Sequence, residues 1–112
     1  MKMIRAIIQP HRLEAVRDAL TQRGIMGMTV FEARGYGRQR GHTEVYRGAE
    51  YQVAFRPKIV ADLVVPDNQV DDATDAIVSA AKSGSVGDGK IFIFEVGDAI
   101  RIRTGDRDEN AL

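Results

Sequence analysis

The chain has no cysteine and only 2 histidines. Without cysteine there is no disulfide and no thiolate metal site, and two histidines argue against a histidine-rich metal site. No apolar run approaches the roughly 18 residues of a membrane span, and the apolar part of the N-terminal stretch is too short for a signal peptide. We therefore expect a cytoplasmic protein.

An excess of either charge is also missing. The 112 residues include 16 Lys and Arg against 16 Asp and Glu, so no net field attracts nucleic acid or an acidic membrane. This excludes a generic polyanion binder, and no nucleic-acid partner is expected. At this length, with 44% hydrophobic residues, the chain is expected to form one domain over residues 1–112.

The spacing of apolar residues predicts two strand–helix–strand units. Pro10 follows the first strand, Gly24 ends the first helix, and Asp67 is placed to cap the second helix. Strands are expected over residues 2–9, 27–36, 58–65 and 91–96, and helices over 11–23 and 67–82.

This order is the ferredoxin-like split β-α-β arrangement, an α+β βαββαβ sandwich with an antiparallel sheet. Two crossover helices cover only one face of such a sheet. The last strand nevertheless offers Ile91 and Ile93 on one side and Phe92 and Phe94 on the other. Because an uncovered apolar face favours association, we expect a closed homo-oligomer.

Two stretches fall outside the regular elements. Residues 37–55 are polar and glycine-rich without a steady period, and roughly 19 residues exceed the usual connection length, so we interpret them as a long mobile loop. Residues 100–103 are expected to be extended, with Arg101 and Arg103 on one side, and the polar tail after them to be loosely ordered. Paired guanidinium groups can fork onto phosphates; the alternative is a solvated charged edge.

The stretch from Gly84 to Lys90 fits the phosphate-binding pattern G-x-x-x-x-G-K. Two requirements of a triphosphatase loop fail, because Ile91 stands where Ser or Thr should follow and the loop enters a strand instead of a helix. Gly84, Gly87 and Gly89 still allow backbone amides to converge on an anion, and Lys90 adds a positive charge. On the loop alone, a flexible connection whose glycines only cap a helix and form a turn is the favoured alternative.

Taken together, these segments resemble the PII nitrogen-regulatory signal transduction proteins of the GlnB and GlnK type over nearly the whole chain. The matching runs are G-I-M-G-M-T-V from Gly24, G-Y-G-R-Q-R-G-H-T-E-V-Y-R-G-A-E-Y from Gly35, V-G-D-G-K-I-F from Val86 and I-R-I-R-T-G from Ile100. The resemblance implies a compact homotrimer with an ATP or ADP site in each cleft between subunits. It also implies that residues 37–55 are the family's T-loop, 83–90 its B-loop and 101–112 its C-terminal segment.

Carried over residue by residue, the resemblance implies binding sites for a nucleotide and for 2-oxoglutarate. The stretch from Gly87 to Lys90 would hold the phosphates, with Arg101 and Arg103 reaching them from the neighbouring subunit. The implied nucleotide-binding residues are Ile7, Thr29, Gly35, Gly37, Arg38, Gln39, Asp62, Val64, Gly87, Asp88, Gly89, Lys90, Arg101 and Arg103.

The implied 2-oxoglutarate site is occupied together with MgATP, and Gln39 would coordinate the Mg²⁺ ion. Lys58 would pair with the distal carboxylate; without the resemblance, it would be interpreted as a solubility charge at a strand end. The implied 2-oxoglutarate-binding residues are Gln39, Arg40, Gly41, Lys58 and Gly87.

The function implied is that of a non-enzymatic sensor that reads ATP, ADP and 2-oxoglutarate and regulates nitrogen assimilation through its T-loop. Its targets would be an ammonium transporter, a nucleotidyltransferase or nitrogen-metabolism enzymes, with a membrane reached only through a transporter. Tyr51 matches the position that is nucleotidylated in relatives, and Arg47 the one that enters the transporter exit. From the sequence alone, Tyr51 is typical of a strand residue and Arg47 of an exposed loop charge.

Two other interpretations stay open. One is a slow ATPase that uses the same inter-subunit site, and the other is a bare oligomerisation domain, which would explain the two-faced sheet but not the clustered Gly, Arg and Lys. The chain also departs from the family's usual residues at Gln9, Ala54, Arg56, Asp62, Ser83 and Ser85.

Overall fold

The computed structural model describes residues 1–37, 45–46, 49–50 and 54–112, and the side chains outside 38–53. The strands are β1 (Lys2–Ile8), β2 (Thr29–Gly35), β3 (Val45–Tyr46), β4 (Ala49–Glu50), β5 (Arg56–Val65) and β6 (Gly89–Glu95). The α-helices are α1 (Leu13–Gln22) and α2 (Val70–Ala81), and the 3₁₀ helices are η1 (Pro10–Arg12), η2 (Asp67–Gln69) and η3 (Asp108–Ala111).

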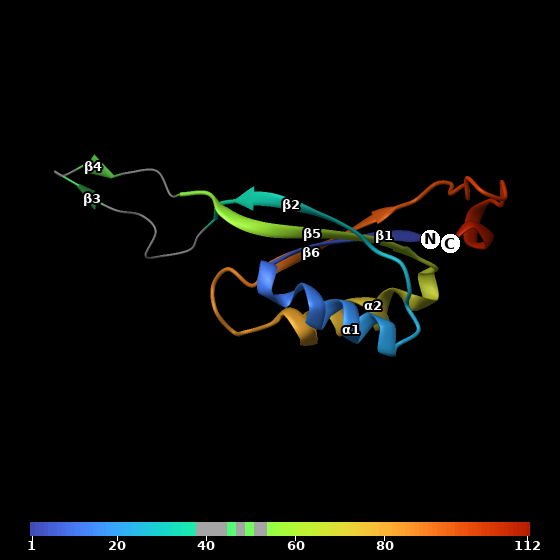
Figure 1. Cartoon of the computed structure of the whole chain (residues 1–112), viewed down its shortest axis with the longest axis horizontal. Helices are drawn as coiled ribbons and strands as arrows, with labels where there is room; N and C mark the ends of the chain where they lie inside the picture. The colour runs from blue at the N-terminus through green and yellow to red at the C-terminus, as the bar shows by residue number, and fades with distance from the viewer. Residues whose placement is uncertain (38–44, 47–48, 51–53) are drawn as a thin grey trace.

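The main sheet has the strand order β2-β5-β1-β6, and every neighbouring pair in it is antiparallel. Helices α1 and α2 lie side by side on one face of this sheet (Figure 1). The predicted ferredoxin-like α+β architecture is therefore confirmed. Within the 37–55 stretch, β3 and β4 pair in the register Val45 to Glu50 and Tyr46 to Ala49.

The core lies between the helices and the sheet. Ile4, Ala6 and Ile8 alternate along β1 and are at most 2% exposed, which is the period of a strand with one buried face. Helix α1 contributes Val16 and Leu20 at helical spacing. Helix α2 contributes Ala73, Ala76, Ile77 and Ala81, while β5 adds Ile59, Leu63 and Val65.

The opposite, helix-free face of the sheet is defined by the residues that alternate with this core. Its cross-strand neighbours include Phe31 with Val60, Ile7 with Val60, and Ile7 with Lys90. Phe31, Phe92 and Phe94 on this face are 44–45% exposed. The expectation of apolar residues on both sheet faces is thus met, and the homotrimer that would cover this face stays a prediction.

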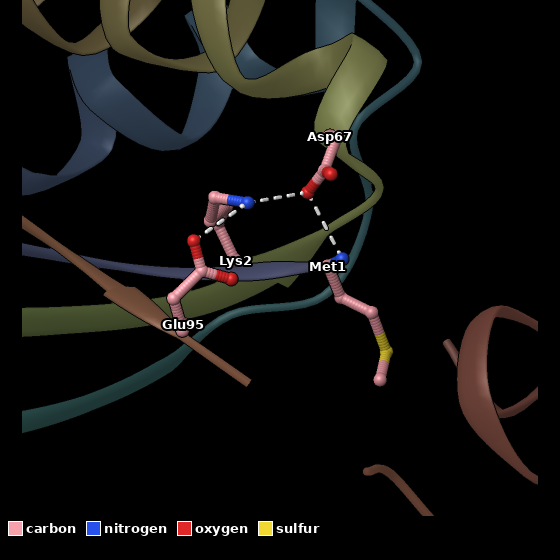
Figure 2. Close-up of polar contacts among 4 residues, drawn as sticks. All are labelled: Met1, Lys2, Asp67 and Glu95. Atoms are coloured by element: carbon pink, nitrogen blue, oxygen red, sulfur yellow. Dashed lines mark hydrogen bonds and ion pairs between the residues drawn. The ribbon is translucent and has the colours of Figure 1, made fainter. Parts of the chain in front are cut away.

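Asp67 has a different role from the helix cap expected for it. Its side chain makes no capping hydrogen bond at the start of η2 or α2. Instead its Oδ1 atom lies 2.9 Å from both the Met1 ammonium and Lys2 Nζ (Figure 2). Lys2 Nζ also lies 3.1 Å from Glu95 Oε1. The hydrogen bonds from Lys2 and the N-terminus lower the pKa of Asp67, because they stabilise its ionised form.

The C-terminal segment also differs from the expectation of an extended stretch and a loose tail. Ile100 makes a single antiparallel bridge with Arg107, and the chain turns between them. The turn closes because Gly105, at φ 75°, donates its amide to the Arg101 carbonyl at 2.7 Å. The tail then folds back as η3 instead of continuing outward.

None of the helices in the described part of the chain is long and apolar enough to cross a membrane.

Replacing Ile77 by Ala should lower the free energy of unfolding by about 2–5 kcal/mol, because it leaves a cavity under α2. Ile77 is 1% exposed, whereas the next residue, Val78, is 49% exposed. Val78→Ala is therefore the matched control and should cost less than about 1 kcal/mol. Chemical denaturation at one fixed protein concentration measures both values, and equal losses would contradict this assignment of the core.

Candidate functional site

A groove of about 770 Å³ opens at one end of the sheet, where β1, the end of β2, the start of β5 and the loop between α2 and β6 meet. The sequence analysis assigned many of its lining residues to the nucleotide site or to the 2-oxoglutarate site. The predicted residues that line it are Ile7, Gly35, Gly37, Lys58, Gly87, Gly89 and Lys90. The structure thus brings together four segments that are far apart in the chain.

Strand register explains why these side chains share the groove. Ile7 pairs with Val60 on one side and with Lys90 on the other, so all three stand on the helix-free face. Lys58 lies two residues before Val60 and therefore points to the same face. The groove consequently combines an apolar wall with the ammonium groups of Lys58 and Lys90.

The loop from Ser83 to Gly89, which we call the glycine loop, has three positions whose backbone favours glycine. Gly84, Gly87 and Gly89 have φ values of 88°, 102° and 111°. A Cβ atom on Gly89 would lie 1.8 Å from the Ile7 carbonyl oxygen. The glycine loop therefore enters β6 in direct backbone contact with β1, with Gly87, Gly89 and Lys90 at the groove wall.

Asp88 is part of this loop, but its side chain does not line the groove. Its carboxylate accepts hydrogen bonds from the Ser83 amide at 2.7 Å and the Gly84 amide at 2.8 Å, and a further one from the Ser83 hydroxyl. These bonds, from Ser83 above all, lower the pKa of Asp88 to about 2. The carboxylate is thus ionised at physiological pH and committed to the loop itself.

Lys58 joins the glycine loop to β5. Its Nζ atom donates to the Gly87 carbonyl oxygen at 3.0 Å. An ammonium group has three donors, so this bond leaves donors for a ligand carboxylate. The contact places the cation predicted for 2-oxoglutarate at the same loop that is predicted to hold phosphates.

Thr29, Asp62 and Val64 stand on the helix-free face but do not line the groove. Both oxygens of Asp62 accept hydrogen bonds from Arg5, from Nε at 2.9 Å and from an Nη at 2.8 Å. The Arg5 guanidinium also lies 5.7 Å from the centre of the Phe31 ring, within cation–π range. The carboxylate of Asp62 is therefore already paired within the chain.

Arg101 and Arg103 lie at the other end of the sheet from the groove. The glycine loop is at the start of β6 and the C-terminal segment follows its end, on the far side of the molecule in Figure 1. A seven-residue strand spans roughly 20 Å. Arg101 instead donates to the Leu112 carbonyl at 2.7 Å. Within a single chain, these two arginines do not meet the groove.

Several predicted residues lie outside the described residues. They are Arg38, Gln39, Arg40, Gly41, Arg47 and Tyr51.

Sequence reasoning missed four residues at or beside the site: Arg5, Tyr36, Val86 and Phe92. Tyr36, Val86 and Phe92 line the groove, and Arg5 holds Asp62. The Tyr36 ring also meets the Phe55 ring edge-on, with centroids 5.0 Å apart, at the two ends of the T-loop. Strand alternation could have identified Arg5 and Phe92, because both share the face of Ile7.

The groove is suited to an anionic ligand with a flat apolar part. Apolar and aromatic side chains form its walls, Lys58 and Lys90 supply two ammonium groups beside Gly87 and Gly89, and no carboxylate side chain is among its described lining residues. Phosphate groups fit such donors. The described residues contain no group of three or more His, Cys, Asp or Glu that could hold a metal ion.

The family model and three similar proteins found by comparison all carry the same family name. Residues 1–106 match the family model described as nitrogen regulatory protein P-II. The chain is 56% identical to "Nitrogen regulatory protein P-II 1" of Escherichia coli (strain K12), with all of both chains covered. It is 55% identical to "Nitrogen regulatory protein P-II" of Pasteurella multocida (strain Pm70) and 54% identical to that of Haemophilus influenzae (strain ATCC 51907 / DSM 11121 / KW20 / Rd), again over both full chains.

Gly89→Ala should destabilise the protein strongly and disturb the groove. The added Cβ would overlap the Ile7 carbonyl oxygen, and φ at residue 89 is 111°, so β1 and β6 must separate locally. Thermal unfolding and the amide NMR shifts of β1 measure the effect. Gly97→Ala is the control, because nothing lies within 4 Å of a Cβ there. If the two variants melted together with unchanged β1 shifts, the close approach would be refuted.

Proposed function

This chain belongs to the nitrogen regulatory protein P-II family, a family of signal transducers in nitrogen regulation, and from that membership we propose that it senses ATP, ADP and 2-oxoglutarate. The observation that carries the proposal is the meeting of the glycine loop, Lys90, Lys58 and Ile7 at one groove. Amides and ammonium groups suit phosphates, and the apolar walls suit a base.

The nucleotide site is completed by a second copy of the chain in a homotrimer. Arg101 and Arg103 cannot reach the groove of their own chain, but a neighbour packed on the helix-free face brings its own pair to it. The half-exposed Phe31, Phe92 and Phe94 on that face supply the apolar surface for such packing. Thr29, Asp62 and Val64 on the same face lie where the adenine end of the ligand and the subunit contact meet.

2-Oxoglutarate binds beside the nucleotide, in the presence of Mg²⁺. Lys58 pairs with the distal carboxylate. Its ammonium group either gives up its hydrogen bond to the Gly87 carbonyl or keeps it beside the new contact. Gln39 coordinates the metal with the phosphates and the keto acid, and Arg40 and Gly41 complete the contacts. An uncharged amide oxygen is sufficient for a Mg²⁺ ion that phosphates already hold.

The output is the conformation that residues 37–55 present to a target protein. Ligands in the groove touch Gly35, Tyr36 and Gly37, which lead into this T-loop, so differential contacts at its base redistribute its conformers. The targets are an ammonium transporter, a nucleotidyltransferase or enzymes of nitrogen metabolism, met in the cytoplasm. Arg47 contacts a transporter, and nucleotidylation of Tyr51 changes the docking surface by bulk and charge.

The protein acts as a regulator and not as an enzyme. Its full-length relatives carry the name of regulatory proteins, and the described groove lining has no carboxylate to serve as a base for water. The alternative is a slow ATPase in the same groove, with phosphate release far below the usual rate of about 10 per second. Steady-state release at ordinary enzyme rates would favour this alternative.

Isothermal titration calorimetry tests the proposal. The protein should bind ATP and ADP, and its affinity for 2-oxoglutarate should rise when MgATP is present, because the ligand then shares the metal. Absence of ATP binding, or an unchanged 2-oxoglutarate affinity, would overturn the proposal.

The shared site is tested by charge reversal. The double variant Arg101→Glu and Arg103→Glu should bind ATP at least about tenfold more weakly, because two charge-assisted contacts become repulsive. Arg17→Glu is the control, since Arg17 is an exposed residue of α1 on the other side of the molecule. Equal ATP affinities for the two variants would show that Arg101 and Arg103 do not contact ATP.

A further inference from the structure

We propose that Asp88 is a positioning residue, whose carboxylate folds the glycine loop so that its amides face the groove without itself touching the ligand. This inference rests on the proposed nucleotide site and adds the question of what holds that site in shape. The sequence pattern had placed Asp88 among the ligand contacts, and the side-chain geometry gives it another role.

The contacts of Asp88 close the glycine loop from within. Oδ2 accepts from the amides of Ser83 at 2.7 Å and Gly84 at 2.8 Å. Oδ1 accepts from the Ser83 hydroxyl and, at 3.5 Å, from Gln9 Nε2. The Ser83 hydroxyl oxygen in turn accepts from the Ser85 amide at 3.2 Å. One side chain thus links the residues after α2, the end of the loop and the residue after β1.

Asp88 and Gly87 line different cavities, whereas Gly89 and Lys90 line both. Asp88 lines a separate cavity of about 250 Å³ on the helix side of the sheet, together with Ile77 and Ala81 of α2. Its neighbours Gly87 and Gly89 line the groove and have φ values of 102° and 111°. Glycine at these values has many other accessible conformations, so the loop needs a constraint, and the Asp88 hydrogen bonds supply it.

The charge of Asp88 is a poor match for a direct contact with phosphate. A carboxylate repels a phosphate group, and the repulsion grows as water is excluded. A direct electrostatic role would therefore make ATP bind more tightly once the charge is removed. The positioning role predicts the opposite change, weaker ATP binding. Loss of the carboxylate would release Ser83 and Gly84 and let the loop amides turn away.

The ionisation of Asp88 agrees with this role. Its hydrogen bonds from Ser83 and Gly84 lower its pKa to about 2, so the group accepts with its full negative charge at neutral pH. Hydrogen bonds to an ionised acceptor are about twice as strong as neutral ones. The hydrogen bonds that Asp88 accepts from the loop therefore all end on a charged acceptor.

The test compares Asp88→Ala and Asp88→Asn with the unchanged protein, using ATP titration and amide hydrogen exchange without ligand. Asp88→Ala should bind ATP about tenfold or more weakly, since several charge-assisted bonds are lost. Asp88→Asn keeps an acceptor oxygen of the same shape and should fall in between. In both variants, exchange should accelerate across residues 83–90 and stay unchanged in β1. Asp75→Ala, an exposed residue of α2, is the control and should match the unchanged protein.

Each outcome decides the inference. ATP binding by Asp88→Ala that is equal to or tighter than that of the unchanged protein overturns it, as does faster exchange throughout β1, which would indicate only a loss of global stability. If Asp88→Ala does not fold, Ser83→Ala carries the test, because it removes one donor to the same carboxylate and should weaken ATP binding in the same direction. If the unchanged protein binds no ATP, the proposed function fails instead.

Discussion

The backbone contact between Gly89 and Ile7 is the constraint on which the rest of the site depends. Because residue 89 has no side chain, β6 can begin with its backbone against the Ile7 carbonyl, and this start fixes the register that pairs Ile7 with Lys90. A slip of one residue would turn Lys90 to the helix side and move its charge out of the groove. The position of Lys90, which we propose to bind phosphate, therefore follows from a packing requirement between two strands.

The two faces of the sheet differ: the helix side holds the core, and the helix-free side carries the groove. On the helix side, Ile4, Val16 and Ile77 are buried in the core. On the helix-free side, Phe31, Phe92 and Phe94 remain 44–45% exposed, and two charged side chains make contacts within the chain. Arg5 holds Asp62 in a two-point ion pair, and Lys58 holds the glycine loop by the Gly87 carbonyl. The apolar side chains of this face are the surface on which the proposed second subunit would pack.

Most of the fold was predictable from the sequence, because it follows from periodicity. Alternation along β1 and helical spacing in α1 and α2 report directly which side is buried, and glycine or proline marks the ends. The sequence did not reveal contacts between residues distant along the chain: Asp67 was expected to cap the helix that follows it, but its carboxylate lies 2.9 Å from the Lys2 ammonium. The tail after Ile100 also reverses at Gly105. This was not predicted, because the bridge of Ile100 with Arg107 joins residues seven apart and leaves no local periodic pattern.

The site was predictable where a motif carries the chemistry and unpredictable where the tertiary structure decides the contact. The sequence indicated that the glycine loop and Lys58 would lie together, and they meet at one groove, whereas the bonds of Asp88 with its own loop and of Arg101 with Leu112 could not be read from the sequence. The most direct test of the central claim is an amide NMR titration of the protein with ATP. The account predicts that the largest shift changes fall on Gly87, Gly89 and Lys90, with a smaller change at Ile7. Saturable ATP binding that leaves these amides unshifted would contradict it.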